Sequence, residues 1–246
     1  MDKIKQYLED DMQNVASALG ESALKEYLEQ GYVLVKGLVP LSMISEIRTE
    51  IQGVHERMAK EIPHGANVTW ENLPDGEKVI RQLMGSELVS STLKGLYEDS
   101  ALRQGAAELL GEEVENFHSK LMMKAAGRGS FTPWHSDWGY WRKTFKEPKQ
   151  MNAFLAIDHS TIENGCIRYV PGSHHEYKEH EHNPSAFGFG IGLPGGLDAF
   201  EHDAVEMEPG DVVYHGSMTI HASEANQSDK DRVMNTFAFT GKNIWL

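Results

Sequence analysis

The sequence predicts one mainly β domain with antiparallel sheets and a helical layer packed on the β core. Three observations support this fold class. Short apolar segments in the second half are separated by glycine, proline and asparagine, which is typical of antiparallel sandwiches and barrels. Amphipathic segments in the first half are typical of helices. No internal repeat or long linker divides the 246 residues, so residues 1–246 are expected to form a single domain.

The first half is expected to be mainly helical. An amphipathic helix is predicted at residues 22–30 and an apolar strand at residues 32–35. After Pro40, apolar residues at three- and four-residue spacing predict another helix: Ile44, Ile47, Ile51 and Val54. A longer helical pattern covers residues 78–110, with breaks near Gly85 and Gly95.

The second half is expected to form short strands. The apolar segments that predict them lie at residues 117–124, 151–157, 166–170, 211–214 and 233–239. A glycine-rich stretch at residues 181–200 is too long for a hairpin turn, so it is either a disordered insertion or a lid. We favour a lid, because Phe187, Phe189, Ile191 and Leu193 would give it an apolar underside.

The composition disfavours several kinds of partner. A formal net charge of −14 disfavours nucleic acid, which needs a basic face, and it disfavours anionic lipid. A small-molecule partner is the remaining expectation, with neutral, zwitterionic or cationic molecules favoured. The single cysteine, Cys166, excludes an internal disulfide or a cysteine-built metal site. The first residues lack a leader-like apolar core and no segment is apolar enough to span a bilayer, so the cytoplasm is the expected compartment. The sequence does not indicate an oligomeric state.

The first chemical signal is the His-x-Asp pair formed by His135 and Asp137, which lies among tryptophans at residues 134–141. On an extended strand both side chains would point to the same face, about 7 Å apart, and would reach a single metal ion. Such pairs also arise by chance. Taken alone, a surface histidine and aspartate beside a buried tryptophan is the more frequent explanation.

The second signal follows a Gly-Asp turn at residues 210–211, where an apolar strand is followed by a short break and then by His221. His221 would add a second imidazole to the His-x-Asp pair and complete a two-histidine, one-carboxylate site with open metal positions. The alternative for His221 is a hydrogen-bonded core histidine. His215 is a rival ligand, but its place inside the apolar strand favours a structural role.

The third signal is Arg232, which stands between the polar residues 229–231 and the apolar strand at residues 233–239. A buried arginine at a strand end needs an anion, and a guanidinium group pairs well with a carboxylate. An ordinary surface arginine that balances Asp229 and Asp231 is the alternative.

Together the signals resemble one family, the phytanoyl-CoA dioxygenase-like iron(II)/2-oxoglutarate oxygenases, which include ectoine hydroxylases. The resemblance covers about residues 31–240. It rests on the His-x-Asp segment, on the Asn-Gly-Cys and Pro-Gly-Ser-His motifs within residues 163–174, and on the C-terminal motif. That last motif comprises the Gly-Asp-Val-Val turn and then His221, Ser223, Asn226, Ser228 and Arg232.

The resemblance implies a double-stranded β-helix, or jelly roll, and a catalytic set of His135, Asp137, His221 and Arg232. The first three of these would bind Fe(II). Arg232 and Ser223 would bind the distal carboxylate of 2-oxoglutarate, while Trp141, Lys124 and Thr132 are further cosubstrate or active-site candidates. Met122 departs from the family, because some relatives have a polar residue there that contacts the cosubstrate.

The activity implied is hydroxylation of a C–H bond by dioxygen, with 2-oxoglutarate released as succinate and CO2. A small soluble molecule such as an amino-acid derivative or natural-product intermediate is the expected substrate, because no basic cluster marks a coenzyme A site. The other possibilities are an acyl-CoA hydroxylase of the same family, a zinc hydrolase and a non-catalytic jelly-roll protein. Trp138, Tyr140, Trp141 and Phe237 suggest an aromatic-walled substrate pocket, or else ordinary core packing.

Overall fold

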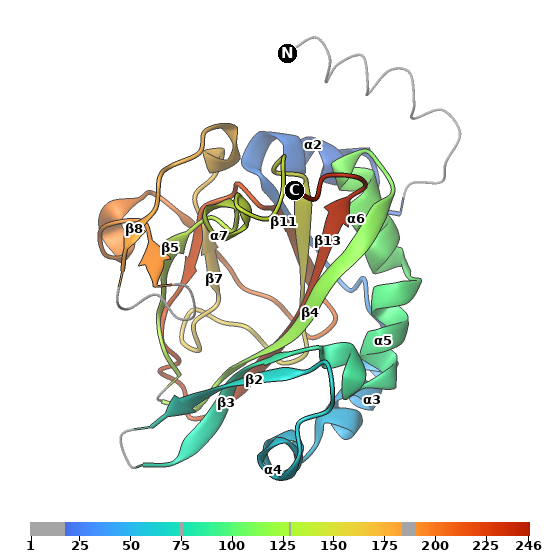
Figure 1. Cartoon of the computed structure of the whole chain (residues 1–246), viewed down its shortest axis with the longest axis vertical. Helices are drawn as coiled ribbons and strands as arrows, with labels where there is room; N and C mark the ends of the chain where they lie inside the picture. The colour runs from blue at the N-terminus through green and yellow to red at the C-terminus, as the bar shows by residue number, and fades with distance from the viewer. Residues whose placement is uncertain (1–17, 74–75, 128, 184–189) are drawn as a thin grey trace.

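The computed structural model describes residues 18–73, 76–127, 129–183 and 190–246. Two antiparallel sheets and a layer of helices form the described part of the chain (Figure 1). The larger sheet has seven strands in the order β1-β11-β6-β13-β4-β3-β2, and the smaller sheet has four in the order β10-β7-β12-β5. The sequence therefore predicted the fold class correctly. The fold is a jelly roll with flanking helices.

The strands of the larger sheet come from both halves of the chain. In sheet order they are β1 (Tyr32–Val35), β11 (Val212–Gly216), β6 (Gln150–Ala156), β13 (Arg232–Gly241), β4 (Val114–Lys124), β3 (Lys78–Met84) and β2 (Asn67–Asn72). The long β13 is paired along most of its length, since it lies between β4 and β6. It is therefore a central strand, and Arg232 stands at its first position.

The smaller sheet consists of three-residue and four-residue strands. They are β10 (Asp203–Val205), β7 (Ile167–Tyr169), β12 (His221–Ser223) and β5 (Thr132–His135). Side chains of both sheets share a buried cluster, in which Tyr32, Val213 and Met234 of the larger sheet meet Ile167 and Tyr169 of the smaller one. The two sheets thus pack face to face, as in a sandwich.

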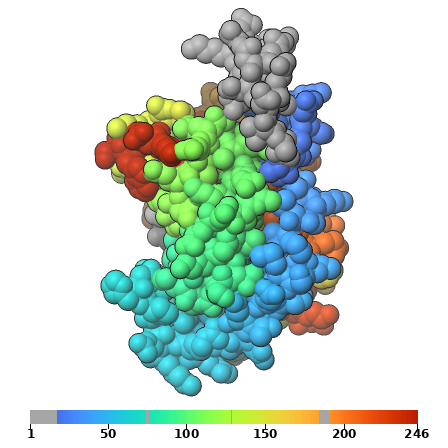
Figure 2. Space-filling view, turned by 90° about the vertical axis from the view of Figure 1, so that its right-hand side faces the viewer, coloured from blue at the N-terminus to red at the C-terminus, as the bar shows by residue number. Residues whose placement is uncertain are grey.

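Helices cover the opposite face of the larger sheet. They are α2 (Glu21–Gln30), α3 (Leu41–Ile51), α4 (Val54–Lys60), α5 (Ser91–Glu98) and α6 (Ala101–Leu110), with a short 3-10 turn at Ser86–Leu88. Figure 2 looks onto this layer, where the blue α3 region and the green α5 and α6 regions lie side by side. Ile44 and Ile47 of α3 are fully buried in the same cluster as Leu121 and Phe237 of the sheet. The main apolar core therefore lies between this helical layer and the larger sheet.

The prediction of helix over residues 78–84 was wrong. These residues form β3, which pairs with both β2 and β4. The β-branched residues Val79 and Ile80 suit a strand, and pairing on both sides outweighs a weak helical spacing. The expected break at Gly95 was also misplaced, because Gly95 lies within α5 and the helix ends at Glu98.

The glycine-rich stretch is only partly described. Its centre, residues 184–189 with Phe187 and Phe189, lies outside the described residues. On either side, β8 (Glu181–His182) and β9 (Ile191–Gly192) pair as a two-stranded sheet. Leu193 is buried with Trp134 and Ile220 on the smaller sheet, so at this position the stretch packs onto the β core.

The remaining short elements are α7 (Trp138–Trp141), the 3-10 turns Ser173–His175 and Leu197–Ala199, and two isolated bridges. Within the described residues, no helix combines the length and the apolar character needed to cross a membrane.

Candidate metal centre

Three buried side chains from the predicted motifs meet at one point between the two sheets. His135 is the last residue of β5 and His221 is the first residue of β12, and these two residues are paired across the smaller sheet. The carboxylate of Asp137 lies beside them, with 4.0 Å between Asp137 Oδ1 and His135 Nε2. One ligand atom from each of the three residues lies within 4.8 Å of the other two. This spacing suits a single metal ion.

The local geometry of the His-x-Asp pair differs from the prediction. Asp137 is not on an extended strand, because its backbone is helical (φ −62°, ψ −28°) and it immediately precedes α7. Its carbonyl accepts hydrogen bonds from the Tyr140 and Trp141 amides, which start this helix. The sharp turn after His135 brings the carboxylate back toward the imidazole, whereas an extended segment would hold the two side chains about 7 Å apart along the strand.

Hydrogen bonds fix which imidazole nitrogen faces the centre. His135 Nδ1 lies 2.8 Å from the carbonyl of Pro133, and His221 Nδ1 lies 2.9 Å from the carbonyl of Thr219. Since a carbonyl only accepts, each Nδ1 must carry the proton and donate it. Each Nε2 is therefore an unprotonated nitrogen with a lone pair, as metal ligation by histidine requires.

The Asp137 carboxylate is held by two neighbours. Asn152 Nδ2 donates to Asp137 Oδ2 at 2.6 Å, and His215 Nε2 lies 3.3 Å from the same oxygen. Tyr169 donates its hydroxyl proton to His215 Nδ1 at 2.8 Å, which leaves Nε2 as the donor toward Asp137. His215 thus orients the carboxylate and leaves Oδ1 for a metal. This arrangement agrees with the expectation that His215 has a structural role.

Burial and charge set the protonation states of the centre. Burial is the main cause that lowers the pKa of His135 to about 3 and of His221 to about 4, so both imidazoles are neutral at pH 7. Burial alone would raise the pKa of Asp137. The hydrogen bond from His215 and the neighbouring imidazoles outweigh that effect and hold this pKa below its usual range. Two neutral imidazoles and one carboxylate form a ligand set that is ready for a divalent cation.

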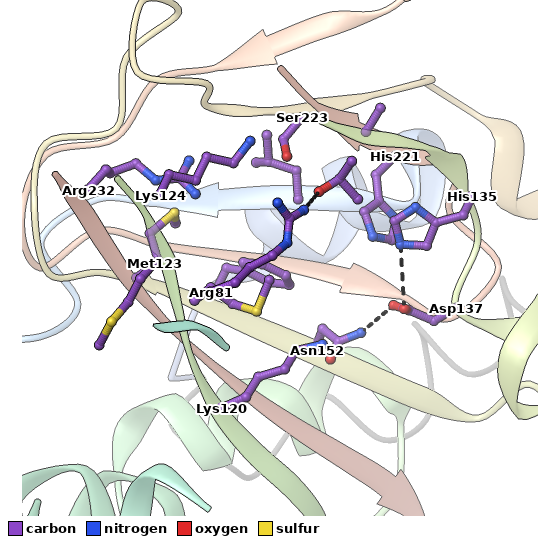
Figure 3. Close-up of a pocket in the computed structure, with 16 residues that line it drawn as sticks. Arg81, Lys120, Met123, Lys124, His135, Asp137, Asn152, His221, Ser223 and Arg232 are labelled. Carbon is purple, nitrogen blue, oxygen red and sulfur yellow. Dashed lines mark hydrogen bonds and ion pairs between the residues drawn. The ribbon is translucent and has the colours of Figure 1, made fainter. Parts of the chain in front are cut away.

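A pocket extends from this centre along the larger sheet (Figure 3). Besides the three side chains of the centre, it is lined by four cationic residues and by polar or apolar residues from both sheets. The cationic residues are Arg81, Lys120, Lys124 and Arg232, and the others include Met122, Thr132, Asn152, Phe154 and Ser223. The pocket is therefore strongly cationic, although the chain as a whole is acidic.

Arg232 and Lys124 lie together at the end of the pocket away from the histidines, as Figure 3 shows. They are paired across β13 and β4, and each is buried. Arg232 donates from one terminal nitrogen to the carbonyl of Gly165 at 2.6 Å, while its buried Nε has no partner among the described residues. Lys124 donates to the carbonyl of Glu224. Burial lowers the pKa of Arg232 to about 10 and, with help from the arginines, that of Lys124 to about 6.

Gly165 of the Asn-Gly-Cys motif makes this end of the pocket possible. Its φ of +79° is in the left-handed region, and a Cβ there would lie 2.3 Å from the Glu224 carbonyl oxygen. Only glycine avoids both problems. The motif therefore serves to place backbone carbonyls where Arg232 and Lys124 need acceptors.

The structure brings most of the predicted site residues together. The pocket is lined by His135, Asp137, His221, Ser223, Lys124, Thr132 and Arg232. Thr132 accepts a hydrogen bond from Arg81 at 3.0 Å, so its hydroxyl positions that guanidinium group. The apolar Met122 also lines the pocket, as the departure from the family pattern implied.

Two of the four aromatic residues predicted to line the substrate pocket, Trp141 and Phe237, are placed elsewhere, whereas the ring of Tyr140 lies 5.3 Å from that of His135. Trp141 points toward Phe117, Phe145 and Ile244 and packs in their cluster. Phe237 is fully buried in the main core, with its ring 5.5 Å from that of Tyr97. Neither residue is among those that line the pocket. Both have the ordinary core packing that was the alternative to a substrate-pocket role. Helix α7 turns Trp141 away from the metal centre.

Sequence reasoning missed Arg81, Lys120 and Asn152. Arg81 could not be found, since residues 78–84 were assigned to a helix. Two of the three carried a usable signal. Lys120 is four residues before Lys124 on a predicted strand and so shares its face, and Asn152 is a polar residue inside an apolar strand.

Comparisons with known proteins agree with this site. Residues 27–234 match the family model described as phytanoyl-CoA dioxygenase (PhyH). An L-proline trans-4-hydroxylase from Streptomyces griseoviridis is 28% identical over 54% of this chain and 47% of that protein. A probable phytanoyl-CoA dioxygenase from Caenorhabditis elegans is 26% identical over 89% of this chain and 74% of that protein.

The fold has close structural relatives. The crystal structure of EctD from S. alaskensis with 2-oxoglutarate and 5-hydroxyectoine superimposes with a TM-score of 0.77 at 18% sequence identity. The superposition covers 94% of this chain and 79% of EctD. Since the family model spans most of the chain, including all three residues of the candidate metal centre, the chain belongs to the phytanoyl-CoA dioxygenase family.

Proposed function

We propose that this protein is an Fe(II)- and 2-oxoglutarate-dependent dioxygenase that hydroxylates a C–H bond of a small molecule. The observation that carries the proposal is the combination of two sites in one pocket. A buried centre of two neutral imidazoles and a carboxylate lies at one end, and a buried arginine whose Nε no described residue accepts from lies at the other. Membership of a dioxygenase family supports the same reading.

His135, Asp137 and His221 are the proposed Fe(II) ligands, through His135 Nε2, Asp137 Oδ1 and His221 Nε2. Two histidines and one carboxylate on one face of a metal are typical of non-haem Fe(II) oxygenases, because the other face stays open. Asn152 and His215 hold the second carboxylate oxygen and so keep Oδ1 turned toward the metal. Neighbours of this kind commonly change metal affinity by ten- to a hundred-fold.

Arg232 is the proposed partner of the distal carboxylate of 2-oxoglutarate, with Ser223, Lys124 and Thr132 around it. The guanidinium group is buried and its Nε has no acceptor within the described ranges of the chain, which suits a carboxylate that would accept hydrogen bonds from it. When bound, Fe(II) and 2-oxoglutarate supply, with dioxygen, the oxidising power for C–H hydroxylation, and 2-oxoglutarate leaves as succinate and CO2. The side chains named above would hold both groups and orient them toward the substrate.

The substrate is proposed to be a small molecule that fits beside the metal centre. The name of the S. griseoviridis relative supports this choice, since that protein acts on L-proline. An acyl-CoA substrate, as in the C. elegans relative, is the competing choice within the family. The four basic residues of this pocket lie inside the domain, and Arg81, Lys124 and Arg232 are held by internal groups, whereas the bulky coenzyme A phosphates would need basic groups outside the pocket.

An anaerobic titration with Fe(II) and 2-oxoglutarate tests the proposal. The oxygenase should develop a weak visible charge-transfer band when both are present and should release succinate when oxygen is admitted with a substrate. Zn(II) in place of Fe(II) should give neither signal. Absence of the band in a fully folded protein, or hydrolysis supported by Zn(II), would refute the oxygenase and favour a hydrolase or a non-catalytic protein.

A further inference from the structure

The four cations of the pocket belong to two separate groups. Arg232, Lys124 and Arg81 influence one another, since the charges of both arginines lower the pKa of Lys124. Lys120 lies four positions back along β4, next to Asn152 and below Asp137 in Figure 3. It faces the metal centre, whereas the other three surround the proposed cosubstrate end.

The charge of Lys120 acts on the histidines of the metal centre and their neighbours. After burial, its charge is among the causes that lower the pKa values of His118, His215 and His221. Burial lowers the pKa of Lys120, and the charge of Asp137 offsets only part of this effect. The Lys124 ammonium, by contrast, responds to Arg232, Arg81 and Glu71.

The Lys120 ammonium has no hydrogen-bond or ion-pair partner in the part of the chain that the structure describes. Each other cation of the pocket has one: Lys124 and Arg232 donate to backbone carbonyls, and Arg81 contacts Thr132 and Glu71. A partly buried ammonium without a partner is costly unless a ligand supplies an anion. His118, two residues away on the same strand face, also has a buried Nε2 without a partner among the described residues.

The charges of the pocket with Fe(II) and 2-oxoglutarate bound also single out Lys120. This step rests on the proposed function. Fe(II) carries two positive charges, 2-oxoglutarate two negative charges and Asp137 one. Arg232 balances the remaining negative charge, Arg81 is balanced by Glu71 at 3.7 Å, and Lys124 has a pKa of about 6. Burial also lowers the pKa of Lys120, and the charge of Asp137 opposes that effect. Among the described residues, Lys120 is the basic side chain of the loaded pocket that no protein group pairs, and it lies on the metal side where a substrate must bind.

We propose that Lys120 binds an anionic group of the primary substrate, a carboxylate or a phosphonate, and thereby places the neighbouring C–H bond at the metal. The substrate class is then a small acid or zwitterion. This keeps the zwitterionic ligand expected from net charge but replaces the neutral and cationic ones, because the local charge inside the pocket is opposite to that of the whole chain.

Two probe pairs test the proposal on the Fe(II)- and 2-oxoglutarate-loaded enzyme without oxygen. L-Proline is compared with L-prolinamide, and methylphosphonate with its dimethyl ester, by calorimetry and by the change in the visible band. The variants are Lys120→Met, which removes the charge at similar length, and Lys120→Arg, which keeps it. Lys143→Met, an exposed lysine, is the matched control. Lys120→Gln is a second neutral variant if Lys120→Met folds poorly.

We expect the two probes that carry the anionic group, the carboxylate of L-proline or the phosphonate of methylphosphonate, to bind at least ten-fold more tightly than the analogues in which that group is neutral. Lys120→Met should remove that advantage, while Lys120→Arg and Lys143→Met should keep most of it. The dissociation constant of 2-oxoglutarate should change less than two-fold in every variant. The proposal is wrong if no anion binds the wild-type complex, if the neutral analogues bind equally well, or if Lys120→Met binds anions like the wild type.

This test separates the two proposals. A wild-type protein that forms no band with Fe(II) and 2-oxoglutarate would refute the proposed function before any probe is added. A normal band that is insensitive to the anionic probes would refute only the role of Lys120. Once a substrate is known, Lys120→Met should raise its Michaelis constant and increase the succinate released per hydroxylated product.

Discussion

The two sheets contribute opposite kinds of group to the same pocket. The smaller sheet supplies His135 and His221, which burial keeps neutral. The larger sheet supplies all four cations, from β3, β4 and β13. Burial lowers pKa values on both sides, yet the outcomes differ. An imidazole becomes a metal ligand when it loses its proton, whereas a guanidinium group stays charged and must find an anion.

This difference implies two kinds of dependence. The histidines of the smaller sheet should control whether a metal binds at all, and the basic residues of the larger sheet should control which anions bind next to it. Variants of these two groups should therefore separate metal affinity from anion affinity, and the first two predictions below test that separation.

The largest effect is expected on replacing a proposed metal ligand. His135→Ala, Asp137→Ala or His221→Ala should reduce turnover by more than about a thousand-fold and remove most bound iron, because each takes away one of three ligands. Iron content and succinate release measure this directly, with the exposed His159→Ala as the control. A variant that kept most of its iron and activity would show that the ligand is misassigned.

Arg232→Ala should next raise the 2-oxoglutarate requirement while leaving iron affinity nearly unchanged. Loss of one partner of a buried charge pair costs about 2–5 kcal/mol, which corresponds to roughly thirty-fold weaker binding or more. Titration of 2-oxoglutarate into the Fe(II) protein measures it. Arg232→Lys should recover part of the loss, and the exposed Arg142→Ala should show none. A parallel loss of iron would contradict the division between the sheets.

His215→Ala and Asn152→Ala test the groups that reach across from the larger sheet to Asp137. Each should weaken iron binding by about ten- to a hundred-fold, less than the loss of a ligand, since Asp137 would remain but be poorly oriented. His215→Ala should also lower the free energy of unfolding, because it leaves the buried Tyr169 hydroxyl without its partner. Iron affinity equal to that of the wild type in both variants would show that Asp137 needs no support.

The last prediction concerns acid and should affect activity near neutral pH least. It describes a loss of stability of the metal-free protein as the pH falls. His135 and His221 have pKa values of about 3 and about 4 when folded, but near 6.5 when unfolded. Protons therefore favour the unfolded chain. Their contribution to stability is complete above pH 6.5 and is lost as the pH falls toward 4. By pH 5 each imidazole should cost on the order of 2 kcal/mol.

Urea unfolding of the metal-free protein at pH 7.5, 6 and 5 measures this loss. His221→Ala should show a smaller decrease between pH 7.5 and 5 than the wild type, because one titrating group is gone. An equal decrease in both proteins would mean that His221 does not titrate with the depressed pKa given above.

Particular residues show how far sequence reasoning reached. The strands at residues 117–124, 151–157 and 233–239 were predicted from short runs of apolar residues, because the buried face of a strand needs such residues. Residues 78–84 were assigned to a helix, since pairing with β2 and β4 is a long-range effect that local spacing does not reveal. Trp141 was expected at the pocket, but the turn of α7 directs it into the aromatic cluster with Phe117.

The sequence by itself determined the chemistry available: which residues carry imidazole, carboxylate and guanidinium groups, and which segments are apolar enough to bury them. Only the tertiary structure decided which groups meet. His135 and His221 are 86 positions apart (221 − 135) and become neighbours through the pairing of β5 with β12. Lys120 lies on β4 of the larger sheet, whereas Asp137 follows β5 of the smaller sheet and precedes α7. Pairing and packing between distant segments depend on the whole chain, so the charge inside the pocket cannot be read from net charge or local pattern.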